Sequence, residues 1–153
     1  MRKARAALRY ASRPAPGTCE RADPRRPRRG ATTREAFTHL LKSAAIEFTR
    51  EDLPRGCMIS LSGTHQAPDL VPIRNMMVEH RAASEVYLAE RIRKGIRDGD
   101  MPSDINIEAL AAFVNALVRG LAVQARDGAS REKLLEIGRV AMEAWPVVSK
   151  AAA

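Results

Sequence analysis

The segment that most restricts how this chain can fold is the apolar stretch from Ile105 to Arg126, whose spacing predicts a helix. Leucines, valines and a phenylalanine form one stripe, and mostly small apolar residues occupy the other sides. A helix that is apolar over most of its circumference must be covered over most of it. Too few helices are expected nearby in one small chain. We therefore favour a second copy of the chain as the cover, with a central core helix of a monomer as the alternative.

Pairing of the last two helices of each subunit would give a four-helix interface, and two-fold symmetry makes such a patch self-complementary. The last helix is expected to be capped by Ser130 and to end at Pro146. Alanine and glycine on the paired helices permit close approach. The residues expected at this interface are Phe113, Ala116, Leu117, Gly120, Leu121, Val123, Gln124, Leu134, Ile137, Ala141 and Trp145.

The rest of the ordered chain also predicts helices. Thr32-Thr-Arg-Glu35 has the form of a capping box, and apolar residues recur at helical spacing from there to about Arg50. The run from Gly56 to Gly63 is ambiguous, although a lone strand would lack a pairing partner. A long helix is expected from Pro68 to Gly99. We expect an all-α domain of about five helices.

Three further boundaries complete this prediction. Pro102 prevents the long helix from resuming, and Ser103 or Asp104 is expected to cap the helix that follows. The helical domain is expected to occupy residues 32–147, followed by a disordered tail at 148–153.

Positive charge is confined to the start of the chain. Residues 1–31 hold ten Lys and Arg and two acidic residues, whereas the remaining 122 residues hold 16 of each sign. Four prolines and a shortage of apolar side chains predict that this segment is disordered. Sequence-blind nucleic-acid binding by this arm is an alternative function, but only Tyr10 is present for base stacking. The balanced body creates no net field that would attract phosphate.

Other classes of function find little support in the residues. Cys19 and Cys57 stand far apart without a metal-ligand partner at a suitable spacing, which fits a reducing cytoplasm and predicts no metal site. No apolar run approaches the roughly 20 residues of a membrane span, so no membrane is expected as a partner. Catalytic motifs around His39, His65, His80, Ser60 or the glycines are lacking. We expect neither an enzyme nor a cofactor.

Three strings of residues carry a resemblance to a known family. They are residues 120–134, GLAVQARDGASREKL; Pro54-Arg-Gly-Cys-Met58; and the break at Gly99-Asp-Met-Pro102 followed by Glu108-Ala-Leu110. The first looks like the junction of the last two helices in the TetR (tetracycline-repressor-like) family of transcriptional regulators. The second resembles the start of a mid-domain helix in one large branch of that family, and the third is similar to the same branch. Together the strings cover most of the helical domain.

This resemblance implies a C-terminal regulatory domain that pairs through its last two helices and encloses a cavity for a small, mostly apolar effector. Met, aromatic and a few polar side chains are expected to line that cavity, with plain core packing as the alternative. His80 in particular fits a core histidine better than a ligand contact. The expected ligand-binding residues are Phe37, Leu41, Cys57, Met58, Leu61, His65, Met76, Met77, His80, Tyr87 and Phe113.

The sequence departs from the family before Thr32. A helix-turn-helix module needs packed helices joined by a short turn, and the 31 preceding residues do not predict one. Residues 5–11 look like the helix that links the DNA-reading module to the regulatory domain, whereas residues 12–31 resemble nothing in the family. Our hypothesis is a late start codon or a frame-shifted stretch, so that specific DNA binding needs a module absent from this chain. A dimeric interaction module without an effector is the competing function.

Overall fold

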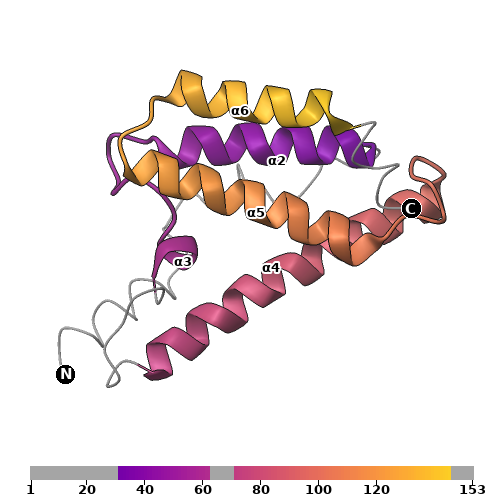
Figure 1. Cartoon of the computed structure of the whole chain (residues 1–153), viewed down its shortest axis with the longest axis horizontal. Helices are drawn as coiled ribbons and strands as arrows, with labels where there is room; N and C mark the ends of the chain where they lie inside the picture. The colour runs from indigo at the N-terminus through magenta and orange to yellow at the C-terminus, as the bar shows by residue number, and fades with distance from the viewer. Residues whose placement is uncertain (1–30, 63–70, 146–153) are drawn as a thin grey trace.

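The computed structural model describes residues 31–62 and 71–145. These residues form the helices α2, α3, α4, α5 and α6 and contain no strand, which confirms the all-α prediction (Figure 1). The helices span Thr33–Phe48 (α2), Met58–Leu61 (α3), Val71–Asp98 (α4), Ile107–Arg126 (α5) and Arg131–Glu143 (α6). The expected arm at 1–31, apart from Ala31, and the tail at 148–153 lie outside the described residues, as do His65 and the predicted start at Pro68.

Most helix ends follow the signals read from the sequence. Thr32 and Glu35 form the predicted capping box at α2, and the side chain of Ser130 accepts a hydrogen bond from the Lys133 amide to cap α6. Gly99 and Gly128 follow α4 and α5 with φ of +78° and +97°, a left-handed backbone that glycine adopts readily.

The cap of α5 is a correction to the sequence prediction. Asn106, and not Ser103 or Asp104, caps this helix by accepting a hydrogen bond from the Ala109 amide. Asparagine is as good an N-cap as serine or aspartate. Ser103 and Asp104 lie earlier in the chain, in the turn that precedes the helix, and do not cap it. The ambiguous Gly56–Gly63 run contains the single turn α3.

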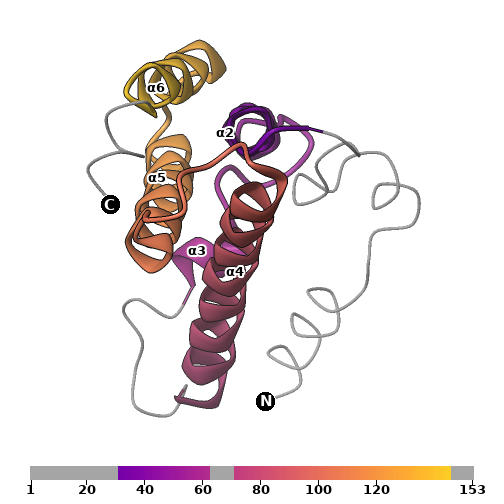
Figure 2. The same ribbon diagram turned by 90° about the vertical axis from the view of Figure 1, so that its right-hand side faces the viewer.

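The core lies where α2 and α6 pack together and where α5 crosses α2 and α4. α2 contacts both α5 and α6, whereas the N-terminal half of α4 extends away from this centre beside α3 (Figures 1 and 2). Phe37 of α2 meets Trp145 edge to face, with ring centroids 5.3 Å apart. The largest fully buried side chains are Phe37, Leu41, Ile92, Leu110, Val114, Leu121 and Leu134.

Helix α5 buries only part of the stripe that its large side chains form. Leu110, Val114 and Leu121 are buried, but Phe113 is exposed and Leu117 is only half-buried. Several small residues and one polar residue take the other inward positions. By length and composition alone α5 would be apolar enough to cross a membrane; 33% of its apolar window is buried, and the helix packs on α2, α3, α4 and α6. Its buried residues are Leu110, Ala111, Val114, Asn115, Leu121, Ala122 and Ala125.

Candidate ligand pocket and subunit surface

A pocket of about 350 Å³ lies among α2, α3, α4 and α5. This volume is at the lower end of the range of small-molecule sites. Most of the wall is made of apolar and aromatic side chains. The lining residues of this class are Ala36, Phe37, Leu40, Ala44, Phe48, Ile59, Ala83, Tyr87, Leu88 and Val118.

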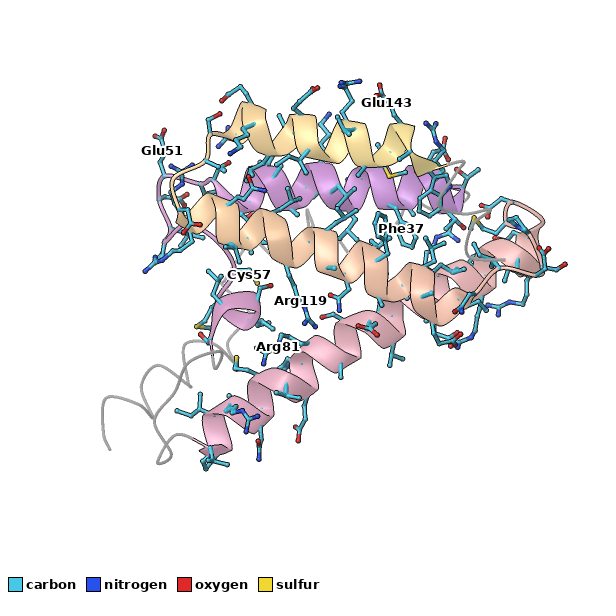
Figure 3. All side chains as sticks on the ribbon, viewed as in Figure 1. Phe37, Glu51, Cys57, Arg81, Arg119 and Glu143 are labelled. Atoms are coloured by element: carbon cyan, nitrogen blue, oxygen red, sulfur yellow. The ribbon has the colours of Figure 1, made fainter. Side chains whose placement is uncertain are left out.

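Polar groups enter the pocket wall from every helix around it. Arg119 on α5 and Arg81 on α4 both project into the region between these two helices beside α3 (Figure 3). Arg81 donates hydrogen bonds from Nη1 to the carbonyls of Ile59 and Ser62, at 2.9 and 2.8 Å. These bonds fasten α3 to α4, so Arg81 helps to build the wall that it lines.

Two other polar lining residues are held by partners outside the pocket. Asn115, which is buried, donates from Nδ2 to the Glu85 carboxylate at 3.0 Å. Glu47 accepts a hydrogen bond from Arg50 at 3.1 Å. Hydrogen bonds to Asp52 and Glu47 raise the pKa of the Arg50 guanidinium above its ordinary value. Glu47 therefore shares one cation outside the pocket with Asp52.

Four of the expected ligand-binding residues line this pocket: Phe37, Cys57, His80 and Tyr87. His80 is exposed rather than a core histidine, and Cys57 is half-buried as the residue that precedes α3. The structure places the others elsewhere. Leu41 and Met77 are buried, Leu61 and Met76 are half-buried outside the lining, and Met58 and Phe113 are exposed, as the burial pattern shows.

The arginines of this wall were not among the polar lining residues predicted from the sequence. A pattern was nevertheless present on α4. His80, Ser84, Tyr87 and Arg91 stand at i, i+4, i+7 and i+11, which places them on one face of a helix. All four line the pocket. Polar side chains that recur along one face of this helix are therefore the pattern that could have identified Arg91.

The second feature is an apolar surface on α5 and α6, two helices that lie next to each other on the left of Figure 2. Phe113, Val123 and Val140 are 38, 46 and 51% exposed there. A Cβ added to Gly120 would meet nothing within 4 Å, so the helix surface around it is open. We call this surface, made of Ala112, Phe113, Ala116, Leu117, Gly120, Val123, Ile137, Val140, Ala141 and Ala144, the α5–α6 face.

Most of the expected interface residues lie on or beside this face, including Gln124, which is half-buried. Leu121, Leu134 and Trp145 do not. They are buried in the core of the single chain and have almost no surface left for a partner. The prediction assigned them to the interface because a helical repeat alone does not reveal which of two apolar faces meets α2. Val140 belongs to the face and was missed.

Other site types were sought as well. Among residues 31–62 and 71–145, no group of three His, Cys, Asp or Glu side chains could hold a metal ion.

Comparison with known proteins identifies the fold. Residues 36–138 match the family described as tetracyclin repressor-like, C-terminal domain. The HTH-type transcriptional repressor ComR of Escherichia coli (strain K12) is 32% identical over 103 residues, which are 67% of this chain and 49% of ComR. The chain thus spans about half the length of this curated relative.

Solved structures agree with this match. The TetR family transcriptional regulator CifR, in a cysteine-substituted form with 26-base-pair operator DNA, is 37% identical with a TM-score of 0.74, over 77% of this chain and 62% of CifR. A TetR transcriptional regulator from Rhodococcus sp. RHA1 is 30% identical with a TM-score of 0.62, over 73% and 59%.

The described residues form an all-helical domain with a pocket among four of its helices. The chain belongs to the TetR family of transcriptional regulators, and the matched part is the family's C-terminal domain. Members of this family are typically homodimers that bind operator DNA and small-molecule effectors.

Proposed function

We propose that this chain is the effector-binding and dimerisation part of a TetR-like transcriptional regulator. The observation that carries the proposal is the pocket among α2, α3, α4 and α5, which has an apolar wall and a few polar groups from several helices. A cavity of this kind is the usual form of a small-molecule site. It favours an effector-binding domain over a module that acts by pairing alone.

The α5–α6 face supports the pairing part of the proposal. Exposed Phe113, Val123 and Val140 surround small residues, and apolar patches of this kind mark surfaces that associate. Gly120 leaves the backbone of α5 open to close approach by a partner helix. Because α6 lies beside α5, a two-fold axis through this face would join two helices from each copy.

An effector would act by changing the arrangement of the paired domains. It must bind one arrangement of the dimer more tightly than another, since equal affinity for both shifts nothing. α4 and α5 both line the pocket, and α5 also carries the proposed pairing face. A ligand in the pocket would therefore act on α5, the helix that sets the arrangement of the two subunits. In an intact regulator this would alter the spacing of two DNA-reading modules.

The effector-binding part is tested by filling the pocket with a bulky side chain. Ala83→Trp adds an indole at a lining position of α4, and Ala82→Trp adds the same group at an exposed neighbouring position outside the lining. A library of small apolar molecules is screened by thermal shift, and hits are measured by titration calorimetry. We expect hits that bind the wild type and Ala82→Trp equally, and Ala83→Trp at least tenfold more weakly. Hits with equal affinity for all three proteins would contradict the proposal, as would the absence of hits.

A further inference from the structure

One arginine in the pocket wall carries two donors that no acceptor among the described residues satisfies. Arg91 of α4 is only 7% exposed and lines the pocket. Its Nη2 donates to the Ala31 carbonyl at 2.5 Å. Its Nε and Nη1 are buried and have no hydrogen-bond partner among the described residues. A buried charged donor without an acceptor is strongly unfavourable, so this position is one where an acceptor from outside would be stabilised.

The nearest carboxylate does not fill this role. Asp100 lies 3.8 Å from Arg91 Nη2, beyond hydrogen-bonding distance. Its two oxygens instead accept from the backbone amide and the hydroxyl of Thr33, each at 2.7 Å. Asp100 therefore holds the start of α2 and faces Arg91 only at Nη2. The Nε and Nη1 donors are left for another acceptor.

The charges around the pocket favour an anion there. Arg81, Arg91 and Arg119 all line it, against Glu47 as the one acidic lining residue. Asp100 forms an ion pair with Arg91 at 3.8 Å, and Glu47 shares Arg50 with Asp52. An excess of positive charge in the wall of a recess of low dielectric attracts an anionic ligand. The remainder of the wall, which includes Phe37 and Leu88, offers contacts to an apolar body.

We infer that the effector is an amphipathic anion, an apolar small molecule ending in a carboxylate that accepts hydrogen bonds from Arg91. This inference rests on the proposed function and adds the chemical class of the ligand. Arginine is suited to the task because its guanidinium stays charged when buried and its planar donors match carboxylate oxygens.

The test uses three probes with one apolar body: octanoate, octan-1-ol and octylamine. Each is titrated calorimetrically into the full chain at neutral pH. Charge-assisted hydrogen bonds contribute about 1.5–3 kcal/mol, so octanoate should bind at least about tenfold more tightly than octan-1-ol, and octylamine most weakly. Equal affinity for octanoate and octan-1-ol would overturn the inference and leave effector binding intact. If none of the three binds, the inference fails, and the library screen then decides whether the proposed function fails with it.

Variants then assign the preference to one side chain. Arg91→Gln should bring the ratio of octanoate to octan-1-ol affinity close to one. Arg93→Gln is the matched control, because Arg93 lies on the same helix but pairs with Glu90 and Glu108 at the surface. The ratio is taken within each protein, so a general loss of stability does not imitate the effect. If Arg91→Gln does not fold, Arg91→Lys replaces it and should lower the ratio severalfold. An unchanged ratio in the folded variant would overturn the assignment.

Discussion

At the scale of single residues, the tightest constraint falls on Gly95, where α4 passes the start of α2. A Cβ added there would lie 2.0 Å from Thr33 Oγ1, 2.4 Å from Asp100 Oδ1 and 2.7 Å from Met101 Cγ. Gly95→Ala should destabilise the fold by about 1–3 kcal/mol, because this packed region must shift to admit a methyl group. Urea unfolding followed by circular dichroism measures the change.

Gly138→Ala is the matched control for this substitution. Its added Cβ would lie 3.4 Å from the Cβ of Leu41, which is close to an ordinary contact. The control should lose far less stability than Gly95→Ala. Similar losses at the two glycines would contradict the packing around Thr33 and Asp100.

Glu35 contributes to the stability of the fold by an amount that depends on pH. Hydrogen bonds from the backbone amide and side chain of Thr32 lower the pKa of the Glu35 carboxyl below its ordinary value of 4.5. A carboxyl whose pKa is lowered in the folded state stabilises the fold fully at pH values above its ordinary pKa. This stabilisation is lost as the pH falls through the lowered pKa. Glu35→Gln should therefore unfold at lower urea than wild type near neutral pH, and the difference should close in acid.

Glu79→Gln, at an exposed position of α4, serves as the control and should show no such convergence. A difference between Glu35→Gln and wild type that stays constant down to about pH 3 would contradict the charge-dependent capping box.

At the scale of elements, the sequence predicted what local chemistry decides. Caps, glycine stops and a 3.6-residue repeat identified α2, α4, α5 and α6, because those signals act within one turn of the chain. The face of α5 that turns inward was harder to predict from the sequence. Two of its sides are apolar, and whether Phe113 or Ala111 turns inward depends on α2 and α4 crossing it. Arg81 and Arg119 were missed for the same reason, since a recess formed by four helices has no local signature that includes them, whereas Arg91 continues the stripe of His80, Ser84 and Tyr87.

The short helix α3 should depend on Arg81 for its position. Arg81→Leu removes the hydrogen bonds to the carbonyls of Ile59 and Ser62 while keeping the stem of the side chain. Bonds to a charged donor contribute about 1.5–3 kcal/mol, so amide hydrogen exchange across Met58–Leu61 should speed up at least tenfold, with α5 unaffected. Arg74→Leu, exposed two turns earlier on α4, is the control. Unchanged exchange at α3 would show that other contacts hold it.

At the scale of the whole molecule, pocket and pairing face meet on α5. Its inner side holds Asn115 in the pocket wall, and its outer side presents Phe113 and Val123. One side of α5 is covered by α2, α3, α4 and α6, and the proposed pairing would cover the other side, which would account for how much of this helix is apolar. A ligand and a partner subunit can then influence each other through one rigid element, as reciprocal coupling requires.

Sedimentation of the whole chain tests the pairing of the α5–α6 face most directly. The wild type should sediment at twice the 16.8 kDa of one chain. Gly120→Arg should sediment as a folded monomer, because a Cβ at this position meets nothing within 4 Å in one chain, while the long charged side chain would block close approach of two. Ala82→Arg, on the exposed surface of α4, should remain dimeric. A wild-type chain that stays a folded monomer at high concentration, or a Gly120→Arg variant that still pairs, would contradict this account.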